Sequence, residues 1–228
     1  MNRILIHSAF LLVLLADMNA CQNRTDGVED LSSYVNPFIG TSVKADTEQS
    51  FNSMGKTFPG AATPFGMTQV SPNTITGGDN GSGYGYQHKT IEGFAFTQMS
   101  SIGWYGDLGN FLVMPTTGEL HVVAGKESDP EKKGYRSEYD KASEAASAGY
   151  YTARLTKYDI LTEATASPHG GALRFTYPAS DLSRIQIDLA RRVGETSTTQ
   201  YVEVVNDNTI RGWMKCTPEG GGWGDGYG

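Results

Sequence analysis

Three loops of the sequence combine glycine, aromatic rings and side-chain carboxylates or amides. They are TGGDNGSGYGYQH (76–88), SSIGWYGDLGN (100–110) and PEGGGWGDGYG (218–228). An aromatic ring stacks on the apolar face of a pyranose, and carboxylate or amide oxygens accept hydrogen bonds from its hydroxyls. Glycine lets the backbone approach the ligand closely. The loops therefore indicate a carbohydrate site, although the same residues also suit core or edge aromatics and turn caps.

Other motifs that carry chemistry are missing from the sequence. GSGYGY (81–86) is not the GxGxxG fingerprint, and a strand-like run follows it where a dinucleotide site needs a helix. A calcium loop starting at Asp79 would place Thr90 where a glutamate is required. The four histidines show no zinc-site spacing, and no GxSxG is present. The loop composition is thus the main chemical signal in the sequence.

Charge and composition narrow the class of protein. The chain has 228 residues and a net charge of −7, from 18 basic and 25 acidic side chains, with no basic block. A nucleic-acid partner is therefore not expected. With 28 glycines and 11% aromatic residues, the composition favours strands and turns over long helices.

The elements that must position these loops are predicted to be strands. Apolar runs recur about every ten residues from FGMTQVS (65–71) through ELHVVA (119–124) to TIRGWMK (209–215). Several alternate, so that Ile185 and Ile187 share one face while Gln186 and Asp188 share the other, which is typical of half-buried antiparallel strands. We expect an all-β fold, an antiparallel β-sandwich with many short strands. One window, SEYDKASEAASAG (137–149), is helix-like or a loop with one helical turn.

The N-terminal segment is typical of an export signal. MNR is followed by ILIHSAFLLVLLA (4–16), which is too short for a usual membrane span. DMNAC (17–21) places Cys21 where a bacterial lipoprotein is cleaved and lipidated. We expect a signal peptide over 1–20, lipid on Cys21 and a polar tether over 21–33, with ordinary signal cleavage as the alternative. The expected location is the periplasm or outer membrane, with membrane contact only through lipid, and Cys216 as a buried, unpaired residue.

Long ordered motifs resemble the N-terminal region of glycoside hydrolase family 92. They are YVNPFIGT (34–41), GKTFPGAATPFGMTQVSPNT (55–74), GSGYGYQHKTIEGFAFTQMS (81–100), GDLGNFLVMPTTG (106–118), the stretch 133–167 and RIQIDLARR (184–192). The resemblance implies a calcium-dependent, inverting exo-α-mannosidase, and members of the family are mostly bacterial. It also implies an architecture in which a β-sandwich precedes an (α/α)6 helical barrel. It implies a mannose-containing glycan as substrate and the helical domain as partner in cis.

The resemblance also suggests roles for residues of this chain. An inverting glycosidase needs two carboxyl groups roughly 6.5–9.5 Å apart, and in the family they lie in the helical domain, beyond residue 228, as do most calcium ligands. The sandwich over 34–228 would supply one wall of the pocket. We expect Asp79, Trp104 and Asp107 to contact sugar or shape the pocket, with Tyr84, Tyr86 and His88 behind them.

Two further expectations concern the segment 55–74 and the end of the chain. Pro64 and Phe65 are expected to form an apolar anchor leading into a strand, on a stiff segment that docks against the helical domain. The sequence ends in the glycine-rich TPEGGGWGDGYG (217–228), so we expect a truncated chain that is inactive alone. The alternatives are a non-catalytic carbohydrate-binding surface lipoprotein and a purely structural sandwich.

Overall fold

The computed structural model describes residues 30–42, 55–74, 82–99, 109–127, 131, 133–191 and 197–216. The chain divides into two units, Met1–Tyr34 and Val35–Gly228. In the first unit, a short 3-10 helix, η1 (Leu31–Tyr34), is capped by the Asp30 carboxylate, which accepts a hydrogen bond from the Ser32 amide at 3.0 Å. The predicted signal peptide and Cys21 lie outside the described residues. Within the described part of the chain, no helix is long and apolar enough to cross a membrane.

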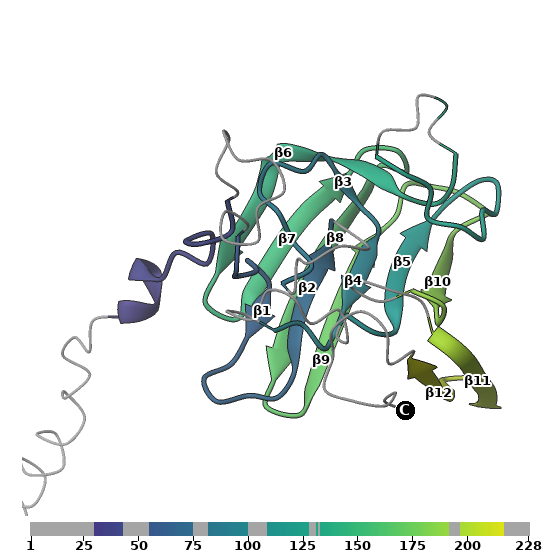
Figure 1. Cartoon of the computed structure of the whole chain (residues 1–228). Coiled ribbons are helices and arrows are strands. Elements are labelled where there is room, and N and C mark those ends of the chain that lie inside the picture. Colours follow the sequence, from purple (N-terminus) through teal and green to yellow (C-terminus); the bar gives the residue numbers. More distant parts are fainter. Residues whose placement is uncertain are drawn as a thin grey trace, which may run out of the picture. The chain divides into compact units, whose positions relative to one another are not determined.

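The described part of the second unit folds into two antiparallel sheets and a separate hairpin (Figure 1). The first sheet has the order β1-β2-β4-β5-β10, with bounds Ala61–Ala62, Gln69–Asn73, Gly93–Ala95, Leu112–Thr116 and Arg184–Asp188. The second has the order β3-β6-β7-β8-β9, with bounds Thr90–Ile91, Ser137–Ser147, Tyr150–Leu155, Ile160–Ser167 and Gly170–Thr176. The hairpin pairs β11 (Ser197–Asn206) with β12 (Thr209–Cys216). The predicted all-β antiparallel β-sandwich is confirmed.

The core lies between the two sheets. Phe94 on β4 packs against Tyr151 on β7 and Phe175 on β9, with ring centroids 6.4 and 6.3 Å apart. Burial alternates along β7, where Tyr151, Ala153 and Leu155 are buried and the residues between them are not. This is the period-two pattern expected of a strand with one face on the core. Each fully buried apolar side chain contributes about 1.5–3 kcal/mol to folding.

The window 137–149 is neither a helix nor a loop, because it forms the long strand β6. Its first residues are already committed to the sheet, since Ser137 and Glu138 pair with β3 and Tyr139 pairs with Leu155 of β7. An irregularity between Asp140 and Ala145 absorbs the helix-favouring residues, and there the Asp140 carboxylate accepts a hydrogen bond from the Ala142 amide at 2.9 Å. The tertiary pairing thus overrides the helix propensity of Ala, Glu and Lys.

The apolar run 119–124 is not a strand either. The segment is irregular, and Leu120 and Val122 are exposed. Its backbone instead binds other parts of the chain. The Tyr135 amide donates to the Val123 carbonyl at 2.8 Å, and the Gln186 side chain donates to the His121 carbonyl at 2.8 Å. The segment is therefore held by one carbonyl bonded to β10 and one bonded to the residues before β6, and it does not continue a sheet.

Phe65 is not an internal anchor. Its side chain is fully exposed, and its backbone has a φ of 59° in a tight turn where the Gly66 amide donates to the Thr63 carbonyl at 3.0 Å. The Met67 amide donates to the Pro168 carbonyl at 2.9 Å, which fastens the turn to the β8–β9 connection. The stiff segment does lead into β2, as predicted, but it presents Phe65 to the outside.

Candidate functional site

The six predicted sugar-site residues fall in two groups. Asp79, Trp104 and Asp107 lie outside the described residues, in the segments 75–81 and 100–108. Tyr84, Tyr86 and His88 lie in the connection between β2 and β3. The described residues therefore show the two ends of each predicted loop and the surroundings of the three later residues.

Thr74 ties together the two ends of the segment 75–81. Its amide donates to the Gly83 carbonyl at 2.8 Å, and its hydroxyl accepts a hydrogen bond from the Gly85 amide at 2.9 Å. The same hydroxyl lies 2.8 Å from Nδ1 of His88. Burial lowers the pKa of His88, with the charge of Glu127 acting in the opposite direction. The Thr74 hydroxyl and Nδ1 of His88 share a hydrogen bond, so this histidine stabilises the end of the loop.

Thr97 plays the same part for the segment 100–108. Its carbonyl and its hydroxyl each accept a hydrogen bond from the Gly109 amide at 3.2 Å. The hydroxyl also accepts one from the Asn110 amide at 3.2 Å. Gly109 has a φ of 81°, a conformation that glycine adopts without strain. Both predicted loops are thus closed at their ends by a threonine.

A pair of buried amide side chains joins these two loop ends. Asn73 precedes Thr74, Gln98 follows Thr97, and the Gln98 amide group donates to the Asn73 side-chain oxygen. Asn73 is fully buried and Gln98 nearly so. Asn73 Nδ2 and Gln98 Oε1 have no hydrogen-bond partner among the described residues. The segments that carry Asp79 and Trp104 therefore both start beside the hydrogen bond between Asn73 and Gln98.

Tyr84 is buried and bonded to a glutamate that the sequence analysis did not select. Its hydroxyl donates to Glu144 Oε1 at 2.7 Å, and the Tyr151 hydroxyl donates to the same oxygen at 2.8 Å. Lys141 Nζ donates to Glu144 Oε2 at 2.7 Å and to the Tyr84 hydroxyl at 2.9 Å. Burial raises the pKa of the Tyr84 hydroxyl, and the neighbouring Tyr139 and Glu144 raise it further. Tyr84 therefore lies behind the pocket wall and holds Glu144 in place.

Tyr86 faces the outside and shares Lys141 with two other tyrosines. The ammonium group lies 4.3 Å from the Tyr86 ring centroid, 4.6 Å from that of Tyr139 and 5.2 Å from that of Tyr84. Burial lowers the pKa of Lys141, and the hydrogen bond to Glu144 opposes that shift. A cation against aromatic faces is held in one position by their negative quadrupoles.

These side chains line a pocket of about 300 Å³. The lining residues are Asn36, Phe38, Ser42, Tyr86, Lys141 and Glu144. Phe38 meets Tyr86 edge to face with centroids 5.9 Å apart, and Tyr86 is 44% exposed. Rings, an amide, a hydroxyl and an ammonium group around one opening can bind a ligand rich in hydroxyl groups. Glu144 accepts three hydrogen bonds from neighbouring side chains, so it stabilises the wall of the pocket.

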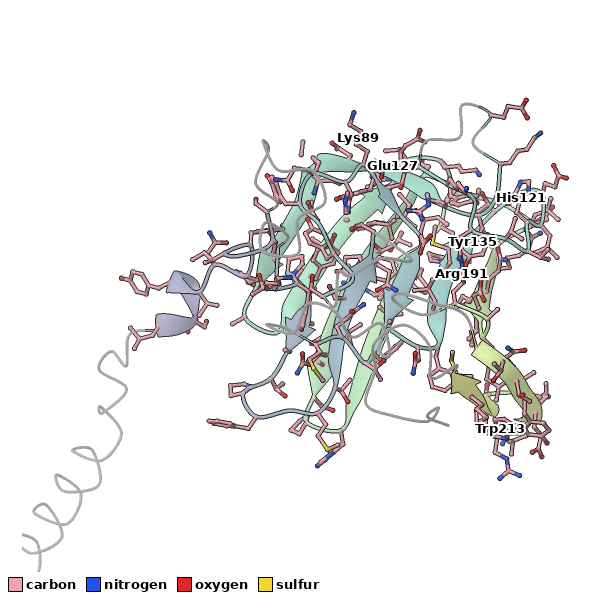
Figure 2. The ribbon with its side chains drawn as sticks, in the orientation of Figure 1. Lys89, His121, Glu127, Tyr135, Arg191 and Trp213 are labelled. Atoms are coloured by element: carbon pink, nitrogen blue, oxygen red, sulfur yellow. The ribbon has the colours of Figure 1, made fainter. Side chains whose placement is uncertain are left out.

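A buried ion pair supports the loop end at Thr74. Arg136 pairs with the fully buried Glu92, and its Nη1 donates to the Thr74 carbonyl at 3.0 Å. Burial raises the pKa of Glu92, while Arg136 and Arg191 lower it. Tyr135 beside this pair donates to Asp188 at 2.5 Å, and Figure 2 shows Tyr135 and Arg191 together near β5 and β10.

A second carboxylate, Glu127, fixes the strand that follows His88. Its Oε2 accepts hydrogen bonds from the amides of Lys89 and Thr90 at 3.0 and 3.1 Å, and from the Thr90 hydroxyl at 2.8 Å. Figure 2 shows Lys89 and Glu127 side by side above β3. The connection from Tyr84 to β3 is thus held at both ends.

The described residues do not fit a calcium site. Among them, no group of three or more His, Cys, Asp or Glu side chains could hold a metal ion. The carboxylates near the pocket are engaged by tyrosines, lysine and arginine, whereas Ca²⁺ takes six to eight oxygen ligands. No step is assigned to a metal in this part of the chain.

Comparisons with known proteins agree with this architecture. The profile of the glycosyl hydrolase family 92 N-terminal domain matches residues 34–227. A family GH92 alpha-mannosidase from Bacteroides thetaiotaomicron has a TM-score of 0.75 and 38% identity, with 87% of this chain and 25% of that chain covered. The GH92 family glycosyl hydrolase ccman5 has a TM-score of 0.63 and 25% identity, with 82% and 24% covered.

A third relative is named as a secreted protein. An uncharacterized secreted glycosidase from Arthroderma benhamiae is 25% identical over 149 residues, which are 65% of this chain and 18% of that protein. Together, these comparisons show that the chain spans a quarter or less of the length of the relatives it matches.

Proposed function

Since this chain belongs to glycosyl hydrolase family 92, where it matches the N-terminal domain, we propose that it is the sugar-contacting domain of an exo-acting, inverting α-mannosidase. The substrate is a glycan that ends in mannose. The reaction hydrolyses the terminal glycosidic bond, and this domain supplies one wall of the pocket in which the terminal sugar sits. A related alpha-mannosidase was solved with mannoimidazole bound.

The observation that supports this proposal is that the two predicted sugar loops start next to each other in the structure. Asn73 and Gln98 bond to each other, and the adjacent threonines, Thr74 and Thr97, close the two loops. Asp79, Trp104 and Asp107 of these loops contact sugar in our proposal. Tyr86 lines the pocket close by in the chain, and Tyr84 and His88 stabilise the surrounding wall.

The general acid and general base belong to the helical domain of the full-length protein. Inverting hydrolysis needs two carboxyl groups roughly 6.5–9.5 Å apart with a water between them. Within the described residues, Glu144 is the one carboxylate that lines the pocket, and it is engaged by two tyrosines and a lysine. The 228-residue chain alone is therefore expected to be inactive. Calcium is bound mainly outside this domain, and the protein is exported and anchored to the cell envelope through lipid on Cys21.

An activity assay with matched chains tests the proposal. The longer chain encoded past codon 228 should release mannose from α-mannosides in a calcium-dependent manner, and the 228-residue chain should release none. Asp79→Ala and Trp104→Ala in the longer chain should lower kcat/KM by about 100-fold, or about 2.7 kcal/mol. Tyr150→Ala, an exposed tyrosine on the second sheet, is the control and should retain activity. Full activity of both loop variants would rule out the sugar-contacting role.

The second candidate is a non-catalytic carbohydrate-binding surface lipoprotein. The pocket beside Tyr86 favours it, because described residues of this domain line a space of about 300 Å³ with rings, an amide, a hydroxyl and an ammonium group. A complete site predicts that mannose, added with calcium, binds the 228-residue chain and changes its tryptophan fluorescence. Binding by the 228-residue chain, with no hydrolysis by any longer chain, would select this alternative.

A further inference from the structure

An apolar groove opens along the inner face of the first sheet. Phe94 on β4 pairs with Val113 on β5, and Val113 pairs with Ile187 on β10. Directly paired residues point to the same side of a sheet, so this row continues the face that packs on the second sheet. Phe94 is fully buried, but Ile187 is 40% exposed and its neighbour on the same face, Ile185, is 58% exposed. The second sheet therefore covers Phe94 but leaves Ile187, at the other end of the row, partly exposed.

The second sheet stops at β9 among the described strands. Within the described residues β9 pairs with β8 alone, and its inward-facing Leu173 and Phe175 are only half-buried. An edge strand offers a row of unpaired backbone groups to another strand. The described part of the sandwich thus has a first sheet that extends, through β5 and β10, past the edge of the second.

The hairpin β11–β12 borders the opening without filling it. Val202 and Ile210 line the groove together with Phe96, Val113 and Ile187, and the groove holds about 250 Å³. Val202 and Ile210 remain 57% and 50% exposed, and among the described strands each hairpin strand pairs only with the other. An isolated two-stranded hairpin is marginally stable in water, so this one is expected to gain a neighbour. Figure 1 shows it beside β10.

We infer that the groove receives an extended segment of polypeptide from the part of the full-length protein that follows β12. The segment pairs with the free edge of β9 and inserts alternate apolar side chains against Val113 and Ile187. It thereby completes the second sheet.

Two observations favour this occupant. Relatives that match this chain are about three and a half times as long, since 87% and 82% of this chain cover only 25% and 24% of two of them, so most of such a chain is available. The hairpin strand β12 itself borders the groove at Gly212, and Cys216, the last described residue, ends the same strand. A second copy is disfavoured because each chain has a net charge of −7, which opposes pairing of identical edges.

Hydrogen exchange on two chains tests the inference. The 228-residue chain and the longer chain encoded past codon 228 are compared at Gly170–Thr176, at the amides not paired with β8. We expect these amides to exchange at least about tenfold more slowly in the longer chain, with both chains monomeric. Equal exchange in both chains, or a reading frame that ends at codon 228, would overturn the inference. A dimer of the shorter chain with protected β9 amides would also overturn it, in favour of a second copy.

Charge substitutions locate the contact. In the longer chain, Ile187→Asp should abolish the added protection of β9, because a carboxylate would then face an apolar segment. Val205→Asp makes the same change on an exposed hairpin residue that does not line the groove, and the protection should remain. Val202→Asp approaches the groove from the hairpin and is used if Ile187→Asp does not fold. Identical protection in the groove and control variants contradicts the inference.

Discussion

Glu144 is the side chain on which the polar wall of the pocket depends. Tyr84, Tyr151 and Lys141 all donate to it, and its side chain is only 1% exposed. Replacing it with alanine removes the carboxylate to which two tyrosine hydroxyls and a half-buried ammonium group donate. A buried group that loses its partner costs the protein its desolvation free energy.

We therefore expect Glu144→Ala to lower the free energy of unfolding by about 3–5 kcal/mol. Urea unfolding followed by circular dichroism measures this change. Glu203→Ala is the matched control, because Glu203 pairs with Arg211 on an exposed strand, where such pairs contribute about 0–1 kcal/mol. Equal losses in the two variants would show that the Glu144 network does not stabilise the fold.

His88 gives the loop end at Thr74 a pH dependence. Burial lowers the pKa of His88 below its ordinary 6.5 in the folded protein. Below pH 6.5, His88 therefore binds a proton in the unfolded chain more readily than in the folded chain. The free energy of unfolding consequently falls as the pH drops from 6.5 toward the pKa of His88 in the folded protein. The urea midpoint should decrease more between pH 7.5 and 5.5 for the native chain than for His88→Asn.

His169→Asn is the control for this pH experiment. His169 is exposed in the β8–β9 turn, and this variant should follow the native chain. Superimposable pH profiles for the native chain and His88→Asn would mean that His88 does not couple protonation to folding.

At the level of elements, the Asn73–Gln98 pair couples two strand ends. Asn73 ends β2, and Gln98 follows β4. Asn73→Ala and Gln98→Ala should each destabilise the chain by about 1–3 kcal/mol, and the double variant by less than the sum, because the two side chains share one contact. Thr116→Ala and Gln186→Ala form a comparison cycle on a hydrogen-bonded pair between β5 and β10. Strict additivity of the Asn73 and Gln98 variants would contradict the coupling.

The elements that the sequence predicted best are those with clear alternation. Ile185 and Ile187 do share one face of β10, and Gln186 and Asp188 share the other. β6 was missed because its Ala, Glu and Lys residues favour a helix in isolation, and only pairing with β3 and β7 makes it a strand. The run 119–124 alternates as a strand would, but its carbonyls bond to side chains and loops.

The candidate site was predictable only in part, for a similar reason. Tyr86 was selected from its loop composition, and it lines a pocket, while its place in a sugar site stays a prediction. Lys141 and Glu144 were missed because they lie in the helix-like window, far in sequence from Tyr84. Their role comes from a strand pairing that brings β6 under the connection from β2 to β3. A local sequence pattern does not predict a contact between residues about sixty positions apart.

At the scale of the whole molecule, the exposed Phe65 turn is the part of the segment 55–74 that can meet another domain. In the 228-residue chain, Phe65→Ala should change the free energy of unfolding by less than about 0.5 kcal/mol, because the ring is fully exposed. In the longer chain, the same substitution should weaken the contact between domains and lower the melting temperature. Leu182→Ala, at another exposed apolar residue, is the control.

Measuring Phe65→Ala in both the 228-residue chain and the longer chain separates internal packing of the ring from docking against another domain. A loss of several kcal/mol in the short chain would mean that the ring packs internally. No change in the stability or activity of the longer chain would rule out docking through this turn.

The pairing of β5 with β10 has a consequence for how the molecule is made. The whole of the β6–β9 meander lies between these two strands in the chain, and yet they are neighbours in one sheet. Such a distant pairing requires a long loop to close before any contact stabilises it, so folding is expected to be slow. On the ribosome, β5 emerges with no partner on one side and must wait until the meander has been synthesised. Refolding after dilution from urea should accordingly show the meander forming before the first sheet is complete.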